Sequence, residues 1–533
     1  MKSNFLFMLK FLLIFPFFLY NSFPQYNERY WVKLYEEPNS DVLHFILPLQ
    51  NEEIIIGGWT NAVQNQGENI LLMKIFGNGN IVWQYSFGEY ELDYVQVLLQ
   101  TKNNQILVGG HTRSFGAGSS EILLLTVNNN GDILWQKAYG TYDDNAIASV
   151  IQTPDGGFLV GGWSYLGGKR SHDALVFKTD SVGTLLWHKH YGTQNYEGVR
   201  DMVQSNDGNY IFVALTTSED SQFDTWVVKI DTNGNIIWQK SFGGKGNESP
   251  INIFNDNGTY IVIGTSDSFG DGTKDIFIFA IDEDGKLLWA YNYPDLYETT
   301  IMNSYKYKEN KFLAIGSARD KNSWNNDLLL LSFKNNGEFE KGKLFGGSQD
   351  EIGFAVAQYQ NSIIAGGYSY SFSNGNSDII LIRTDDEFNI PDGEVKVGNY
   401  SLSGNPISPS LTETITSATI DTTSLLVSEV NFKRTNPNLT MRNLNVTTKV
   451  ETPIADTKTI FLINETDKLT IYINSLDSPI NQIRILNILG QEVKKVEPTW
   501  RNNHFSVPIL DLQVGFYLLQ IEGINQTIPF IKL

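Results

Sequence analysis

The sequence predicts an all-β fold made of a repeated unit, on the basis of two columns of residues that share one period. Tryptophan or its replacement recurs at spacings of 52, 52, 52, 51, 51 and 52 residues, at Trp31, Trp83, Trp135, Trp187, Trp238, Trp289 and Lys341. A polar residue that opens an apolar run recurs with a matching period, at Asn69, Glu121, Asp173, Asp224, Asp275, Asp327 and Asp378. Periods of about 40 to 50 residues are typical of β-propeller blades. The sequence therefore predicts a seven-bladed β-propeller over residues 31–391.

Each repeat reads as four strands. The third repeat shows this best, with strand-like runs at 146–153, 158–163, 174–179 and 185–191 separated by turn residues. Runs such as Ile276 to Phe279 are apolar at consecutive positions, so both faces of such a strand must be buried. Blades packed between two neighbours bury both faces, whereas a two-layer sandwich leaves one face in water.

The ends of the repeat array predict how the ring closes. The tryptophan position opens the array and the polar position closes it, so the last blade lacks an outer strand while the first tryptophan strand lacks a blade. We expect residues Trp31 to Tyr35 to pair with the strand near Asp378 to Thr384, which leaves no free sheet edge at the closure.

Composition excludes several classes of function. The chain has 533 residues, a formal net charge of −20 and no cysteine. Nucleic acids and anionic membranes bind basic surfaces, so neither is expected as a partner. The absence of cysteine excludes disulfides, thiolate metal sites and thiol nucleophiles.

The N-terminus resembles a secretory signal peptide. Lys2 and Lys10 precede an apolar run from Phe11 to Tyr20, which is too short to span a bilayer. We expect a signal over residues 1–25, removal near Gln25 and no membrane span thereafter. An N-terminal membrane anchor formed by Phe5 to Tyr20 is the alternative.

The period ends at Asp392, and residues 392–456 are rich in Ser, Thr, Asn and Pro. This composition favours a spacer with a few extended segments. A small independent β-domain is the alternative, and the sequence does not separate the two.

Few residues suggest metal chemistry, and no other cofactor is expected. His188 and His190 lie on one face of a predicted strand, but solvent-facing residues of an outer strand explain them better than a metal site does. The most suggestive calcium candidates surround Gly270 and Gly272, and they are Asp267, Asp271 and Asp275.

The repeated acids and tryptophans predict structural roles, because a catalytic site normally occurs once. The acids that follow the tryptophan strand are Asp41, Asp93, Glu197, Glu248, Glu298 and Glu351, and we expect them to accept hydrogen bonds from loop amides. The tryptophans are expected to pack between blades. Loops that differ between repeats are the better candidates for ligand contact, and they are richest at Ser114 to Ser120, Tyr165 to Ser171 and Tyr370 to Ser377.

The last part of the chain, residues 457–533, resembles the type A C-terminal sorting domain of the type IX secretion system of Bacteroidetes. The stretches that carry the resemblance are Thr466 to Ile471, Ile483 to Val493 around Gly490, Leu512 with Gly515 and Tyr517, and Phe530 to Leu533. Where that family usually has Pro-Asn-Pro, this chain has Leu462, Ile463 and Asn464. The resemblance implies an immunoglobulin-like β-sandwich and recognition by the type IX secretion machinery.

The repeats also resemble those of bacterial extracellular propellers, and more distantly kelch and quinoprotein repeats. Together the two resemblances imply a protein that passes through the periplasm and is secreted or held at the outer cell surface. We expect a propeller that presents loops to a glycan or protein ligand rather than an enzyme. An extracellular polysaccharide-active enzyme or a quinoprotein is the alternative, and a purely structural surface component is a third possibility.

Overall fold

The computed structural model describes most of the repeat region and parts of the rest of the chain. The described residues are 30–36, 39–61, 67–89, 91–116, 119–166, 171–193, 195–217, 222–269, 274–293, 299–308, 310–319, 325–373, 375–390, 395–400, 405–406, 412–414, 419–421, 426–429, 433–435, 440–443, 460–464, 468–473, 482–487, 491–496, 500–501, 504–509, 511–512, 515–521 and 527–532. The expected signal, residues 1–25, lies outside them. No helix with the length and apolarity of a membrane span occurs in the described parts of the chain.

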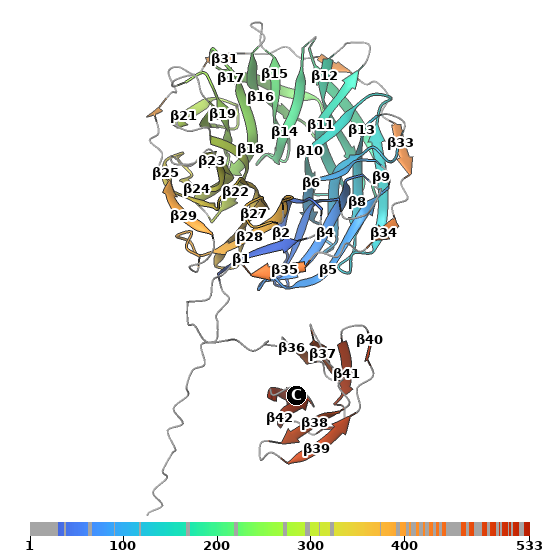
Figure 1. The fold of residues 1–533 in the computed structure, drawn as a ribbon. Coiled ribbons are helices and arrows are strands. Elements are labelled where there is room, and N and C mark those ends of the chain that lie inside the picture. The colour runs from blue at the N-terminus through green and yellow to red at the C-terminus, as the bar shows by residue number, and fades with distance from the viewer. Residues whose placement is uncertain are drawn as a thin grey trace, which may run out of the picture. The chain divides into compact units, whose positions relative to one another are not determined.

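The chain divides into two compact units, residues 1–446 and 447–533. In the described parts of the first unit, the repeats form seven antiparallel sheets (Figure 1). The first three sheets contain β2 (Asp41–Pro48), β3 (Glu53–Thr60), β4 (Asn69–Phe76) and β5 (Ile81–Gly88); β6 (Asp93–Gln100), β7 (Ile106–Thr112), β8 (Glu121–Val127) and β9 (Ile133–Gly140); and β10 (Asn145–Gln152), β11 (Phe158–Leu166), β12 (Ser171–Thr179) and β13 (Leu185–Gly192).

The remaining sheets repeat this order. The fourth to sixth contain β14 (Glu197–Gln204), β15 (Tyr210–Thr217), β16 (Phe223–Ile230) and β17 (Ile236–Gly243); β18 (Glu248–Asp256), β19 (Thr259–Ser266), β20 (Asp275–Ile281) and β21 (Leu287–Tyr293); and β22 (Thr299–Tyr307), β23 (Lys311–Arg319), β24 (Asn326–Lys334) and β25 (Phe339–Gly346). The seventh contains β26 (Glu351–Tyr359), β27 (Ser362–Ser369), β28 (Asp378–Thr384) and β1 (Trp31–Glu36).

The sheets stand in a closed ring, because each inner strand contacts the inner strand of the next sheet and β26 of the last sheet contacts β2 of the first (Figure 1). Between each neighbouring pair lies a cluster of buried apolar side chains. Strands with consecutive apolar residues are buried on both faces, as β8 and β20 are over their whole lengths. The chain therefore contains a β-propeller, as the repeats predict.

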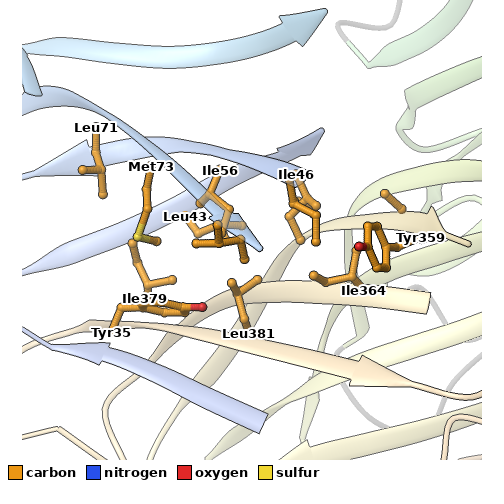
Figure 2. Packing of buried hydrophobic residues seen from close by; sticks show 14 of the residues in the cluster. Tyr35, Leu43, Ile46, Ile56, Leu71, Met73, Tyr359, Ile364, Ile379 and Leu381 are labelled. Atoms are coloured by element: carbon orange, nitrogen blue, oxygen red, sulfur yellow. The ribbon is translucent and has the colours of Figure 1, made fainter. Parts of the chain in front are cut away.

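Strand β1 closes the ring as expected. It pairs antiparallel with β28, with Trp31 opposite Arg383 and Tyr35 opposite Ile379. The apolar cluster at this closure joins side chains of β1, β27 and β28 to those of β2, β3 and β4 (Figure 2). Trp31 is fully buried there, and its Nε1 donates a hydrogen bond of 3.1 Å to the Gly77 carbonyl oxygen in the first sheet.

The tryptophans pack against the hairpin turn of the next sheet, as the repeats predict. That turn contains a glycine with a φ between +75° and +87° at Gly79, Gly131, Gly183, Gly234, Gly285 and Gly337. A side chain at five of these positions would meet the tryptophan of the preceding sheet, in the pairs Trp83/Gly131, Trp135/Gly183, Trp187/Gly234, Trp238/Gly285 and Trp289/Gly337. Between the sixth and seventh sheets, Lys341 replaces the tryptophan and Phe388 replaces the glycine. The Lys341 Nζ lies 5.3 Å from the centroid of the Phe388 ring.

Residues 392–456, expected to be a spacer, contribute an outer strand to every sheet. These strands are β29 (Lys396–Tyr400), β30 (Asn405–Pro406), β31 (Thr412–Thr414), β32 (Thr419–Asp421), β33 (Leu426–Glu429), β34 (Lys433–Thr435) and β35 (Thr440–Asn443). They pair with β25, β21, β17, β13, β9, β5 and β1, so this segment passes around the ring in the reverse order of the sheets. We call residues 396–443 the strap. Its strands are too short to show alternation in the sequence, which is why composition indicates a spacer.

The second unit contains two further antiparallel sheets among its described residues. One has the order β36 (Ile460–Asn464), β37 (Lys468–Ile473), β41 (His504–Pro508) and β40 (Trp500–Arg501). The other has the order β39 (Glu492–Val496), β38 (Ile483–Asn487), β42 (Gly515–Ile521) and β43 (Thr527–Lys532). Gly490, expected at a turn, lies outside the described residues.

Replacing Trp31 with alanine should destabilise the ring by about 3–5 kcal/mol, the usual range for truncating a buried aromatic residue. The change removes both the packing at the closure and the hydrogen bond to Gly77. Thermal or denaturant unfolding would measure it, with Leu186→Ala as the control because Leu186 is 55% exposed on β13. Equal stability of Trp31→Ala and wild type would contradict closure through β1.

Candidate functional site

One end of the ring carries the loops that differ between repeats. Because the strands of a sheet alternate in direction, the connection between its second and third strands and the connection to the next sheet emerge at the same end. We call this end the loop face, and the end with the tight hairpins the turn face. The loops expected to contact a ligand follow β7, β11 and β27, so all three belong to the loop face. Residues 117–118, 167–170 and 374 of these loops are not among those described.

The inner strand of every sheet contains a β-bulge near the loop face. Each register shift leaves one residue of the inner strand without an opposite partner, and these residues are His44, Gln96, Ala148, Arg200, Ile251, Met302 and Phe354. Bulges bend a strand and redirect a side chain, and they are over-represented beside functional sites. We call these residues the bulge ring.

The bulges explain the recurring glycines of the second strands. At Gly58, Gly110 and Gly162 an added Cβ would lie about 2 Å from a carbonyl oxygen of the bulged inner strand, so no side chain fits. In the fourth sheet this position is occupied by Ala214. The inner-strand residue that corresponds to the one supplying the carbonyl oxygen in the other sheets is Gly198 there. The backbone geometry of each bulge thus depends on a glycine in the hairpin that contains it.

Unlike the structural positions, the bulge ring differs in all seven sheets, with His, Gln, Ala, Arg, Ile, Met and Phe in turn. The Arg200 side chain is exposed, and the His44 and Phe354 rings lie 4.9 Å apart across the closure. The His44 Nδ1 is 3.2 Å from the Val95 carbonyl oxygen, and burial lowers the pKa of the imidazole, which favours its neutral form at pH 7. Shared packing does not require this diversity, so these residues are candidates for recognition.

An aromatic tract crosses the loop face between the third and fourth sheets. His172 is at its centre, with ring centroids of Trp163, Tyr165 and Tyr196 at 4.5, 5.2 and 4.9 Å. Phe223 extends the tract, 5.6 Å from Tyr196. All five side chains are partly exposed, and burial lowers the pKa of His172. Such a surface combines apolar ring faces with hydroxyl, indole and imidazole groups that can hydrogen-bond to a ligand.

Asp93, Glu197, Glu248 and Glu351 accept hydrogen bonds from loop amides, as expected of the repeated acids. Glu248 Oε2 accepts a hydrogen bond of 2.6 Å from the Gly244 amide, and Glu351 Oε2 accepts one of 2.7 Å from the Gly347 amide. The other carboxylate oxygen of each accepts from a serine hydroxyl of the second strand. These carboxylates therefore hold the connections between sheets at the loop face. Glu298 is not described, and the sixth sheet opens at Thr299 instead.

The structure gives the described calcium candidates separate partners. Asp267 accepts hydrogen bonds of 2.5 and 2.9 Å from the backbone and side-chain nitrogens of Asn247, whereas Asp275 accepts one of 2.7 Å from Asn292 Nδ2. Asp271 lies outside the described residues. Among the residues that the structure describes, no three or more His, Asp or Glu side chains lie close enough together to hold a metal ion. Calcium binding by Asp267, Asp271 and Asp275 stays a prediction.

The histidine pair on β13 differs from expectation. The rings of His188 and His190 lie 6.0 Å apart, but His190 is fully buried rather than solvent-facing. The sequence could not show this burial, because strand β32 of the strap pairs with β13 at this point, with His190 opposite Asp421.

A cavity of about 560 Å³ lies at the closure on the turn face. Its lining includes Arg383, whose guanidinium group lies 4.6 Å from the Tyr359 ring centroid and donates a hydrogen bond of 2.7 Å to the Gly77 oxygen. These contacts join the seventh sheet to the first. We therefore assign Arg383 to closure of the ring.

Comparison with known families identifies the end of the chain. Residues 465–531 match the family described as the secretion system C-terminal sorting domain. The chain carries a sorting domain. This confirms the resemblance seen in the sequence and implies export by the type IX secretion system, with the sorting domain as the part that engages the secretion machinery. A comparison with curated proteins finds no match.

Three of the solved structures found by comparison illustrate the level of similarity. Polysaccharide lyase Uly1 is 10% identical, with 65% of this chain and 90% of that chain covered and a TM-score of 0.41. The β-propeller domain of the Trilobed protease from Pyrococcus furiosus is 10% identical, with 55% and 97% covered and a TM-score of 0.31. PorZ, a surface component of the type IX secretion system of Porphyromonas gingivalis, is 8% identical, with 94% and 99% covered and a TM-score of 0.16. Likenesses at this level assign no ligand or activity.

Ionisation of Asp224 should make stability depend on pH. Burial and the charge of Glu248 raise the pKa of Asp224 from 3.8 to about 6. Because this pKa is higher in the folded protein than in the unfolded chain, ionisation of Asp224 lowers the stability above about pH 6. The loss becomes smaller as the pH falls and disappears below the pKa of the carboxyl group in the unfolded chain. Asp224→Asn should therefore stabilise the protein by about 1 kcal/mol at neutral to slightly alkaline pH and by about half as much near pH 5, after allowance for solvent screening.

Denaturant unfolding at the two pH values would measure this effect, with Asp231→Asn as the control. Burial acts to raise the pKa of Asp231, but hydrogen bonds from Asn235 and Asn233 outweigh it and lower the pKa. Removing that carboxylate should therefore destabilise the protein at neutral pH. A gain for Asp224→Asn that did not shrink at the lower pH would contradict the raised pKa.

Proposed function

We propose that this protein is a secreted or surface-displayed binding protein whose seven-bladed propeller, residues 31–391, presents its loop face to a glycan or protein ligand. The aromatic tract of Trp163, Tyr165, His172, Tyr196 and Phe223 carries this proposal. The tract lies beside one of the varied loops, and its rings remain partly exposed although most other aromatic side chains of the third and fourth sheets are buried.

A carbohydrate ligand fits this surface best. Sugar rings present apolar C–H faces and hydroxyl edges, which match the ring faces and the polar groups of the tract. Arg200, exposed on the bulge of the same fourth sheet, adds a donor for hydroxyl or carboxylate groups. The net charge of −20 disfavours a highly charged polyanion as the ligand.

The route to the surface forms part of the same proposal. The N-terminal segment 1–25 directs the chain to the periplasm, and an immunoglobulin-like sandwich over residues 457–533 is then recognised at the outer membrane of a bacterium of the Bacteroidetes type. The family match and the two four-stranded sheets of the second unit support the second step. The apolar run from Phe11 to Tyr20 supports the first step.

Replacing Trp163 or Tyr196 with alanine should weaken ligand binding about tenfold or more, because each change removes a stacking surface worth about 1.4 kcal/mol. A glycan array on the purified protein would identify ligands, and titration calorimetry would then compare the variants. Phe76→Ala is the matched control, because Phe76 is 43% exposed at the turn face. Unchanged affinity in both tract variants would contradict the proposed site, and release of product would favour the enzyme alternative.

Deleting residues 457–533 should leave a folded propeller in the periplasm with a melting temperature close to that of the propeller in the full-length protein. The deletion removes the sorting domain but keeps the strap and all of the first unit. Fractionation of the native host and thermal unfolding of the truncated protein would test this. Full export of the truncated protein would contradict the sorting role, whereas failure to fold would contradict the independence of the first unit.

A further inference from the structure

The strap has a period of its own. From β30 onward its strands begin every seven residues, at Asn405, Thr412, Thr419, Leu426, Lys433 and Thr440. The sequence repeats with the same period, since a serine or asparagine followed by an apolar residue occurs at Ser410-Leu411, Ser417-Ala418, Ser424-Leu425, Asn431-Phe432, Asn438-Leu439 and Asn445-Val446. One seven-residue unit therefore corresponds to one sheet of the ring.

Seven residues are long enough to connect the outer strands of two neighbouring sheets. Each successive strap strand pairs with the preceding sheet, from β30 on the fifth sheet to β34 on the first and β35 on the seventh. Seven extended residues span at most about 25 Å, so a step of this length can connect the outer strands of neighbouring sheets. A spacer that only linked two domains would need neither a period nor this order.

Backbone pairing supplies the contact. Every strap strand is antiparallel to the outer strand of its sheet, over five residues at β29 and over two to four at the others. A pairing this short is weak by itself. Pairings linked in series gain strongly from effective concentration, because each one that forms holds the next segment close to its sheet.

We propose that the outer edges of the sheets form a binding surface for an extended polypeptide, that the strap is its ligand, and that the strap stays bound without a covalent connection to the propeller. This is strand addition at a sheet edge, made once per sheet. The strap also places β1 between β28 and β35, so the strand that closes the ring becomes an interior strand. The strap strands that now stand at the sheet edges are only two to five residues long, and such short edge strands are poor templates for edge-to-edge association.

Cleavage of the folded full-length protein tests this proposal. A recognition sequence for a specific protease is placed within residues 391–394 in one variant, within 447–459 in a second, and at both places in a third. After cleavage, size-exclusion chromatography should show the first variant unchanged in size and the second without its sorting domain. In the third variant the strap should still elute with the propeller. Loss of the strap from the propeller in the first or third variant would overturn the proposal.

A second comparison tests the seven-residue unit. In the cleaved third variant, the changes Leu411→Ser, Leu425→Ser and Leu439→Ser together should release the strap at a clearly lower urea concentration. The control carries Ile407→Ser, Ile415→Ser and Val430→Ser, which remove as many apolar side chains at other positions of the unit. Equal release by the two sets would overturn the assignment of one recognition unit per sheet, whereas selective release by the first set supports it.

Discussion

Burial of both faces of every sheet is the constraint on which this structure depends. Strands such as β8 and β20 are apolar at consecutive positions, so each sheet needs a neighbour on both sides. A row of sheets would leave two apolar faces in water at its ends, and only a ring removes them. The N-terminal strand β1 meets this requirement by completing the seventh sheet. That sheet packs against the first through a cluster that contains Trp31 and Tyr35, and Figure 2 shows Tyr35 among its apolar neighbours. The strand that closes the ring therefore also completes its apolar core.

The same constraint explains which residues recur from repeat to repeat and which residues differ. The recurring tryptophans and turn glycines make contacts between neighbouring sheets, and acids such as Glu248 and Glu351 hold the connections between sheets. Between the sixth and seventh sheets, Lys341 and Phe388 replace the tryptophan and the glycine together, and a cation lies against an aromatic ring instead. The residues of the bulge ring differ from sheet to sheet, although some of them, such as His44 and Phe354, also make contacts between neighbouring sheets.

The sequence predicted the features that depend on side-chain periodicity. The repeat length, the two-sided burial and the closure by Trp31 to Tyr35 all leave apolar or aromatic residues at regular positions. The strap was missed although its sequence has a seven-residue period, because backbone pairing makes weaker demands on side chains than core packing does, and strands as short as Asn405–Pro406 cannot show alternation. The burial of His190 was missed for the same reason, since the strand that covers it belongs to the strap. The bulges could have been inferred from the paired glycines, but only with knowledge of the register.

The candidate site could be predicted only in part, for a related physical reason. The composition of Tyr165 to Ser171 and of Tyr370 to Ser377 identifies them as candidate loops. Trp163, His172 and Tyr196, by contrast, are separated in the sequence and come into contact only where the third and fourth sheets meet. Geometry also narrows where recognition can occur. The strap pairs with part of the outer edge of each sheet, where apolar side chains such as Leu186 and Ile237 remain exposed, and the turn face contains contacts that hold neighbouring sheets together. The loop face combines partly exposed aromatic rings with loops whose sequences differ between repeats, so substitutions there leave the contacts of Trp31 and Arg383 with Gly77 at the closure unchanged.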